Sequence, residues 1–238
     1  GDTERILLPA MMRKLDQAGV PENVAPLLSQ NVSVVEVGAH SQIYEKFIDF
    51  LGLRTLIITD IDSGYEENIN EKKVSRHCCP DDTGAAFTSN SSLLFYHGKE
   101  RTDLDYFVNL GPKGKTCAKQ DGVWKSATNG SVYTAYQTKE AGYHGRSFED
   151  AFFSLNEDLL QLGHDRFPSL TKKWYDKFMA DEITPLEFAE QAVNSKPSLA
   201  IEVLLNSEIS ASGHAYSNWK TPAYIEEGLK WLRGDCDA

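Results

Sequence analysis

The sequence predicts an α/β fold in which a mostly parallel sheet is flanked by helices and a helical part follows at the C-terminal end. Three observations support this class. Segments with helical and strand-like patterns alternate over residues 1–64. The apolar residues Leu56, Ile57 and Ile58 follow one another without polar alternation, which is typical of a strand buried on both faces of a parallel sheet. After Gly163 the patterns are helical throughout.

The chain opens with a predicted helix. Asp2 or Thr3 can cap it, and its apolar residues fall near helical spacing; these are Ile6, Leu7, Met11 and Leu15. Pro9 lies in the early turns, where it removes one helix hydrogen bond, so we expect a kink there. Because a sheet of this class should begin with a strand, we also expect that the motif containing this helix starts before residue 1.

A strand and a second helix are predicted next. The segment 32–37 is rich in β-branched residues and ends at Gly38. The segment 41–51 has helical spacing and stops at Gly52, and its expected buried stripe consists of Ile43, Phe47, Phe50 and Leu51. With the strand that contains Leu56, the order helix, strand, helix, strand implies right-handed crossovers in a parallel sheet.

Residues 65–130 form a predicted insertion of hairpins and loops, because this stretch is polar and rich in glycine and lysine. It contains the sequence GPKGKT at 111–116, which has part of the pattern of a phosphate-binding loop. Such a loop needs its first glycine at position 109, where this chain has Asn109. Nucleotide binding is therefore rejected here, and we expect a turn with exposed lysines.

The remaining elements follow from strand alternation and helix caps. A strand is predicted over 131–137, and a helix begins at Ser147, which can form an S-x-x-D capping box with Asp150. A flexible loop is expected over 207–218. Three later helices start at pairs that end in proline, namely Thr184-Pro185, Lys196-Pro197 and Thr221-Pro222.

A chain of 238 residues is long enough for this arrangement. We predict a core domain over 1–163, whose insertion spans about 65–130, and a helical subdomain over 164–238. No apolar run approaches the roughly 20 residues that span a bilayer, and no secretory pattern opens the chain. A cytoplasmic protein without a membrane partner is expected.

The net charge of −11 argues against a strongly basic nucleic-acid footprint. It does not exclude DNA, because carboxylates that hold metal ions add negative charge. The cysteines are too few for a disulfide framework, and they are Cys78, Cys79, Cys117 and Cys236. Cys78 and Cys79 follow His77, which invites a zinc interpretation, yet the C-x₂-C spacing of structural zinc sites is missing. Free cysteines are expected.

The strand that contains Leu56 ends in two carboxylates, Asp60 and Asp62. In parallel α/β sheets ligands bind beyond the carboxyl ends of the strands, which is where this pair falls. If the strand continues, residues two apart share a face, and both carboxylates can reach one cation. A divalent ion such as Mg²⁺ or Mn²⁺ would remove the repulsion between them. The alternative is a polar strand end that caps a turn.

Six segments of the chain carry a resemblance to a known family: GDTERILLP, SVVEVG, FLGLRTLIITDIDS, GRSFEDAF, KPSLAIEVLL and WKTPAYIEEGLKWL. In this order they resemble the C-terminal Toprim region of OLD-family (overcoming lysogenisation defect) ATP-dependent endonucleases, over nearly the whole chain. The resemblance implies a Toprim fold that binds two divalent metal ions and cleaves DNA. It also implies an N-terminal ABC-type ATPase domain in the full-length protein, a homodimer formed through that half, and a setting in phage defence. No ATP is expected to bind to the present sequence.

The resemblance implies five metal ligands, and these are Glu4, Asp60, Asp62, Ser147 and Glu149. Glu4 would be the second glutamate of a V-E-G-x-x-E motif, in which Gly1 is the glycine and the first glutamate precedes residue 1. Lys196 would join Glu4, Asp60 and Asp62 in catalysis by stabilising charge at the scissile phosphate. Because the first glutamate is missing, this fragment alone is expected to bind Mg²⁺ or Mn²⁺ weakly and to cut DNA poorly.

Each implied residue has a simpler structural explanation. Glu4 could be a solvated acid favoured by the helix dipole, and Ser147 could be only a helix cap. Glu149 and Lys196 could be ordinary surface residues.

Two other parts of the sequence could contribute to the site. Glu36 with His40 is an alternative location of the glutamate motif, because VEVG at 35–38 mimics it. His144 precedes Ser147 and could lie near substrate, although an exposed histidine is expected.

Two other functions stay open at this point. A phosphatase of the haloacid-dehalogenase type also has a DxD motif, with the first aspartate as nucleophile. It expects threonine or valine two residues after the second aspartate, where this chain has Gly64. The other alternative is a non-catalytic Toprim module that docks DNA or mediates oligomerisation.

Overall fold

The computed structural model describes residues 1–38 and 40–235, which form two compact units. Unit 1 consists of Gly1–Glu36, Glu140–Tyr143 and Phe148–Pro222. Unit 2 consists of three stretches, residues 37–139, His144–Ser147 and residues 223–235, of which residue 39 is not described. The two units alternate along the chain, and a domain boundary near residue 163 stays a prediction.

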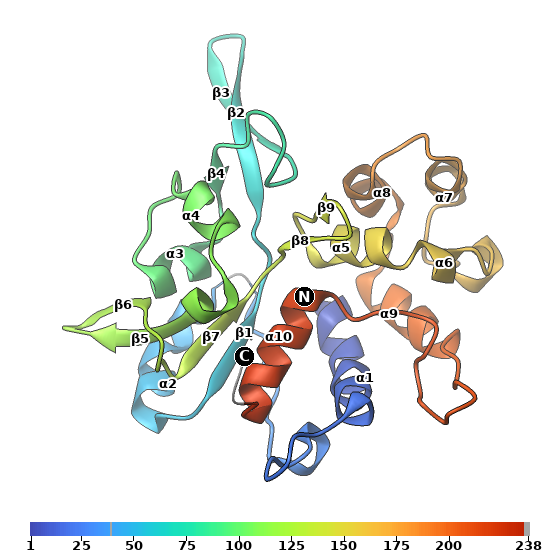
Figure 1. Ribbon diagram of the computed structural model, residues 1–238. Helices are drawn as coiled ribbons and strands as arrows, with labels where there is room; N and C mark the ends of the chain where they lie inside the picture. Colours follow the sequence, from blue (N-terminus) through green and yellow to red (C-terminus); the bar gives the residue numbers. More distant parts are fainter. Residues whose placement is uncertain (39, 236–238) are drawn as a thin grey trace. The chain divides into compact units, whose positions relative to one another are not determined.

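Unit 2 is built on a four-stranded sheet with the strand order β1-β7-β5-β6 (Figure 1). Its strands are β1 (Thr55–Ile58), β5 (Thr116–Gln120), β6 (Val123–Ser126) and β7 (Val132–Ala135). β1 and β7 run parallel with Ile57 opposite Thr134, whereas β5 is antiparallel to both of its neighbours. The predicted α/β class is confirmed. The parallel pairing in this sheet joins β1 to β7, and not to the strand expected over 32–37.

The helix α10 (Ala223–Arg233) packs on β1 and β7, and a glycine allows this close approach (Figure 1). A Cβ atom at Gly228 would lie 2.7 Å from Leu56 Cδ1 and 3.1 Å from the Cβ atom of Ala135. Arg54 Nη1 donates a hydrogen bond of 2.9 Å to the carbonyl of Trp231. The last helix of the chain, which begins after the predicted Thr-Pro pair, is therefore part of the sheet unit.

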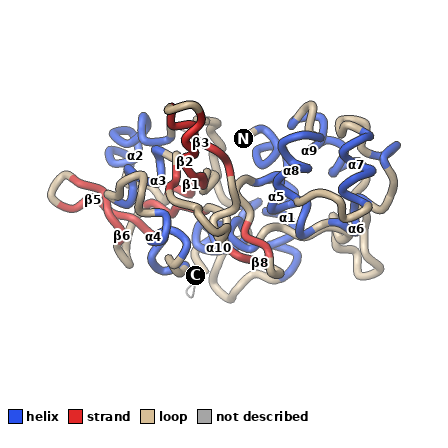
Figure 2. The backbone as a smooth tube through the Cα atoms, turned by 90° about the horizontal axis from the view of Figure 1, so that it is seen from above, coloured by secondary structure: helices blue, strands red, loops and turns tan. Residues whose placement is uncertain are grey.

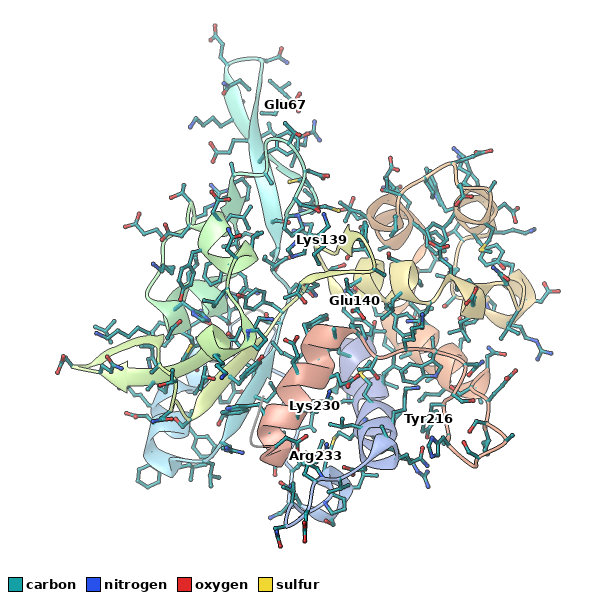
Figure 3. All side chains as sticks on the ribbon, in the orientation of Figure 1. Glu67, Lys139, Glu140, Tyr216, Lys230 and Arg233 are labelled. Atoms are coloured by element: carbon teal, nitrogen blue, oxygen red, sulfur yellow. The ribbon has the colours of Figure 1, made fainter. Side chains whose placement is uncertain are left out.

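The polar stretch after β1 contains short strands and helices. They are β2 (Ser63–Ile69), β3 (Lys72–His77), β4 (Phe87–Thr88), α3 (Ser91–His97), α4 (Leu104–Val108) and η3 (Pro112–Lys115). β2 and β3 form an antiparallel hairpin, as the prediction of hairpins in this stretch requires. The hairpin projects from the rest of unit 2, and Glu67 lies on it (Figures 1 and 3). Glu67 and Arg76 form an ion pair across it at 3.2 Å.

The GPKGKT segment forms η3 and the start of β5, and its two lysines differ. Lys113 is exposed as predicted, but Lys115 is fully buried, so the prediction of exposed lysines is wrong for Lys115. The end of η3 turns this side chain inward, where its Nζ lies 3.7 Å from Glu227 Oε2.

Two predictions for the segment before β1 are wrong. Residues 32–37 form no strand and are mostly exposed, because no neighbouring strand pairs with them in the described part of the chain. The predicted helix forms as η2 (Ser41–Tyr44) and α2 (Glu45–Leu51), but its expected buried stripe is exposed. Phe50, for example, is 85% exposed.

The buried side of α2 is its other face. Glu45 accepts hydrogen bonds from Lys119 and from Trp124 Nε1, and Ile48 packs against the core of unit 2. That core has two clusters of fully or almost fully buried residues, Ile57, Tyr96, Cys117, Trp124 and Val132, and Ile61, Leu93, Leu104, Phe107 and Tyr136.

Unit 1 is helical (Figure 2). Its elements are α1 (Asp2–Ala18), η1 (Leu27–Ser29), α5 (Phe148–Leu155), α6 (Glu157–Leu160), η4 (His164–Arg166), α7 (Lys172–Met179), α8 (Pro185–Ala192) and α9 (Lys196–Leu205). The capping box of Thr184 and Glu187 at the start of α8 is confirmed. Its core is aromatic, and the rings of Phe178 and Phe188 stack with centroids 4.3 Å apart. Leu7, Met11 and Leu15 of α1 are buried as predicted.

The short strands β8 (Lys139–Glu140) and β9 (Tyr143–His144) pair with each other in a two-stranded sheet. Cys78, Cys79 and Cys117 are buried and belong to no disulfide of the described residues, and Cys236 lies outside these residues. Among the helices of the described residues, none combines the length and the apolar character that crossing a membrane requires.

Candidate functional site

β1 ends before the two aspartates of the DxD motif. Asp60 lies two residues beyond Ile58, the last residue of β1, and β2 begins at Ser63. Asp62 has a backbone φ of +49°, in the left-handed region, which aspartate tolerates better than most residues. The condition under which both carboxylates would share a face, a strand that continues through the motif, is therefore not met. A turn, and not a continued strand, directs the second carboxylate.

Asp60 is held by a buried glutamine. Gln137 lies just beyond β7, is fully buried, and donates from Nε2 to Asp60 Oδ1 at 2.7 Å. Its Oε1 accepts the backbone N–H of Ile61 at 2.7 Å, and its Nε2 also donates to Tyr224 Oη at 3.2 Å. Asn90 Nδ2 donates to the carbonyl of Asp60 at 2.6 Å. Both the side chain and the backbone of Asp60 are therefore anchored.

Asp62 lies beside an arginine. Arg146 Nη2 is 3.2 Å from Asp62 Oδ1, and Arg146 Nε donates to the carbonyl of Ser63 at 2.9 Å. The backbone N–H of Asp62 donates to the carbonyl of Arg146 at 3.3 Å. The guanidinium thus neutralises part of the negative charge of the turn and fixes its left-handed shape.

Glu4 lies in the first turn of α1 and is buried, with 6% of its surface exposed. Its Oε1 accepts a hydrogen bond of 3.0 Å from the amino group of Gly1. Its Oε2 is buried, and no hydrogen-bond donor of the described residues reaches it. The alternative that Glu4 is a solvated acid is therefore wrong.

Glu149 joins three helices of unit 1. It is buried in the first turn of α5 and accepts a hydrogen bond of 2.7 Å from Thr3 Oγ1 of α1. Lys196, the first residue of α9, donates from Nζ to Glu149 Oε2 at 3.0 Å while its side chain stays 49% exposed. The positive ends of three helix dipoles thus lie near one carboxylate. The alternative that Glu149 is an ordinary surface residue is therefore wrong. Lys196 forms an ion pair with Glu149.

Ser147 directly precedes α5 and is half-buried. It belongs to unit 2, while Glu149 belongs to unit 1, so the boundary between the units runs through this motif. The position suits a helix cap, and the proposed metal ligation by Ser147 stays a prediction.

The six expected residues fall into two groups. Unit 1 holds Glu4, Glu149 and Lys196, and unit 2 holds Asp60, Asp62 and Ser147. Within residues 1–38 and 40–235, no three histidine, cysteine, aspartate or glutamate side chains are grouped so that they could hold a metal ion. The donor chemistry of the five residues other than Lys196 nevertheless fits a hard divalent cation, because their side chains offer oxygen atoms and one of these, Oε2 of Glu4, is buried without a donor among the described residues.

Comparisons with known proteins bear on the family of the chain. Residues 1–62 match the family described as overcoming lysogenization defect protein-like, TOPRIM domain. Residues 1–62 are therefore similar to an OLD-like Toprim domain. The whole sequence was also compared. Over 212 residues, which are 84% of the chain, it is 26% identical to endonuclease GajA of Bacillus cereus strain HuB5-5. The chain spans 27% of the length of that relative. No solved structure matches the present chain.

The resemblance to the Toprim region of an OLD-family nuclease is thus confirmed. The matched Toprim residues include Glu4 and the turn with Asp60 and Asp62. Ser147, Glu149 and Lys196 lie beyond the matched residues, and their roles stay proposals.

Several residues of the Toprim site were not predicted from the sequence. Gln137 and Arg146 bind the two aspartates, and Thr3 binds Glu149. A signal for Gln137 was present, because polar residues at the carboxyl ends of adjacent parallel strands meet at one edge of a sheet. Thr3 and Arg146 each adjoin an expected site residue, but nothing in the sequence pattern distinguishes them from capping or surface residues.

Three other residues were candidates for the site, and these are Glu36, His40 and His144. Glu36 is exposed and forms an ion pair of 3.0 Å with Arg5 Nε, and His40 is exposed, with its Nδ1 3.3 Å from Ser91 Oγ. His144 is buried, and its Nε2 lies 3.1 Å from the carbonyl of Gln137, so the expectation of an exposed histidine is wrong. Burial lowers the pKa of His144.

Proposed function

We propose that this chain is the nuclease module of an OLD-family, ATP-dependent endonuclease and that it hydrolyses DNA phosphodiesters with two divalent metal ions, Mg²⁺ or Mn²⁺. The observation that carries the proposal is Oε2 of Glu4, a buried carboxylate oxygen without a donor in the segment that matches the Toprim family. Leaving a buried acceptor unsatisfied costs about 1–3 kcal/mol, and a bound cation would remove that cost.

The other ligands would be carboxylates that neighbouring side chains already hold in place. Asp60 is bonded to Gln137 and Asp62 to Arg146, so neither needs to be ordered when a metal ion binds. Glu149, with Ser147, would serve the second metal. When bound, two such ions would activate a water molecule and neutralise charge on the scissile phosphate.

Lys196 would stabilise the negative charge that develops on the phosphate. Its ammonium group is anchored on Glu149 at 3.0 Å, yet half of the side chain remains exposed to an incoming substrate. A fixed cation of this kind acts electrostatically, because little reorganisation is needed at the moment of reaction.

The partners follow from the family. We propose DNA as the substrate, an ABC-type ATPase domain in the same full-length protein, a homodimer formed through that half, and a cytoplasmic setting in phage defence. The relative that is named an endonuclease is much longer than this chain, which spans 27% of it. That length leaves room for a second domain.

The phosphatase alternative is disfavoured by the backbone at Gly64. A Cβ atom there would lie 2.5 Å from the carbonyl oxygen of Arg76 and 2.9 Å from the ring of Phe87. The threonine or valine that such phosphatases carry at this position would therefore clash with the β2–β3 hairpin.

Conversion of supercoiled plasmid DNA to nicked or linear forms tests the proposal. The chain and a longer form that contains it are assayed with Mg²⁺, with Mn²⁺ and with a chelator, each beside the variant Asp62→Asn. We expect metal-dependent cleavage, strongest in the longer form, that Asp62→Asn abolishes. DNA binding without cleavage in every form would favour the docking module, and equal cleavage by the variant would refute the metal site.

A further inference from the structure

We propose that Gln137 is a positioning residue for the metal ligand Asp60, and that Tyr224 of α10 holds Gln137 in its working orientation. This inference rests on the proposed metal-dependent function. It concerns residues of unit 2 alone, and the contacts on which it rests lie within that unit.

The location of Gln137 follows from the sheet. β1 and β7 are parallel neighbours with Ile58 opposite Ala135, so the residues just beyond them leave the same edge side by side. Asp60 follows β1 by two residues and Gln137 follows β7 by two residues. The glutamine therefore meets the aspartate although 77 positions separate them in the sequence.

The orientation of the Gln137 amide is determined by its contacts. Its Oε1 accepts the backbone N–H of Ile61 at 2.7 Å, which only an oxygen can do. The Nε2 group must then face Asp60 Oδ1, at 2.7 Å. Gln137 thus binds the backbone next to Asp60 and one oxygen of its carboxylate, and these two bonds hold that oxygen in place relative to the neighbouring backbone.

Tyr224 extends this arrangement to α10. Its hydroxyl lies 3.2 Å from Gln137 Nε2, and both residues are buried, with Tyr224 2% exposed. Because α10 packs on β1 and β7, the tyrosine comes from the helix that covers the two strands concerned. The carbonyl of Gln137 is also contacted by His144 Nε2 at 3.1 Å, so the glutamine backbone is held as well.

These contacts have the form of a second layer around a metal ligand. Residues that hydrogen-bond to ligating carboxylates fix their orientation, and their loss typically costs about 10–100-fold in metal affinity. Gln137 matches that role, because it binds both the carboxylate of Asp60 and the backbone N–H of Ile61 that follows. It does not contact substrate and is not a catalytic residue.

Mn²⁺ titration followed by electron paramagnetic resonance tests the proposal without measuring DNA cleavage. Gln137→Met keeps the length of the side chain but removes the donor and the acceptor. We expect its dissociation constant for Mn²⁺ to rise at least about tenfold, and that of Tyr224→Phe to rise about threefold. Gln120→Glu, an exposed position on β5, is the control and should bind as the unmodified chain does.

The outcomes separate the two proposals. If the unmodified chain binds no Mn²⁺ at millimolar concentration, the metal-dependent function itself is wrong. If that chain binds Mn²⁺ and a folded Gln137→Met binds it equally well, the positioning role is wrong. Should Gln137→Met fail to fold, Tyr224→Phe decides, because it retains the ring and loses only the hydroxyl; unchanged affinity in this variant overturns the inference.

Discussion

Lys196 Nζ lies 3.0 Å from Glu149 Oε2, and this ion pair joins the first residue of α9 to the first turn of α5. The carboxylate is buried and has a second donor in Thr3 Oγ1. The lysine is half exposed, so its contribution to stability is modest, about 1 kcal/mol or less. Its position therefore suits a role toward substrate better than a role in holding the fold.

Lys196→Met should separate catalysis from metal binding. We expect plasmid cleavage to fall about 100-fold, because a fixed charge near the phosphate is lost, while Mn²⁺ affinity stays the same or rises because Glu149 loses a competing cation. Lys196→Arg retains the charge and is the control. Equal cleavage by Lys196→Met and the unmodified protein would show that this lysine only anchors α9.

The elements predicted correctly carry their own local signals. β1 and β7 are short β-branched runs, and α8, α9 and α10 begin at the expected prolines. A capping box or a proline at the first turn acts within four residues, so the sequence alone determines it. The segment 32–37 has the same β-branched signal, yet it forms no strand, because a strand also needs a partner to pair with.

The face of α2 was mispredicted because both sides of this helix have apolar residues. The hydrogen bonds that Glu45 accepts from Lys119 and Trp124 decide which side is buried, and these donors lie more than 70 positions away. The candidate site shows the same limit. The DxD motif is a local pattern that the sequence reveals, whereas Gln137 meets Asp60 only through the sheet.

One face of α2 packs on the core and the other is exposed, so we expect substitutions on the two faces to change the free energy of unfolding by different amounts. Ile48→Ala removes a side chain that packs on the core cluster of unit 2, and we expect the free energy of unfolding to fall by about 1–2 kcal/mol. Phe50→Ser changes a residue that is 85% exposed and should alter it by less than about 0.5 kcal/mol. Urea denaturation measures both. A larger loss for Phe50→Ser would mean that this face is covered.

The left-handed conformation of Asp62 predicts a difference between two substitutions that both remove its charge. Asparagine tolerates a φ of +49°, whereas alanine is strained there by about 1 kcal/mol. Asp62→Asn and Asp62→Ala should therefore both lose Mn²⁺ binding, but only the alanine variant should also lose that stability. Thermal unfolding in a chelator measures the second effect. Equal stability of the two variants would contradict the strained turn.

His97 predicts a loss of stability in mild acid. Burial lowers its pKa from 6.5 to about 4, and its ring bonds Thr134 Oγ1 and Ser126 Oγ. Because the unfolded chain takes up a proton below pH 6.5 and the folded chain does not until about pH 4, stability should fall as the pH drops through this window. Between pH 7 and pH 5 the loss is about 2 kcal/mol. His97→Gln should remove the part of this slope that His97 contributes, while His144, whose pKa burial also lowers, keeps its own part. An unchanged slope in His97→Gln would refute the prediction.

Lys115 predicts that removing a buried charge stabilises the protein. Burial lowers its pKa from 10.5 to about 8, so at pH 7 the fold carries a charged ammonium group whose nearest acidic oxygen, Glu227 Oε2, is 3.7 Å away. Lys115→Met should raise the free energy of unfolding by about 2–3 kcal/mol below pH 8, and the gain should vanish as the pH approaches 10.5. Lys113→Met, at an exposed position of the same turn, is the control and should change little. A loss of stability in Lys115→Met that Glu227→Gln relieves would show instead that the ion pair outweighs the cost of burial.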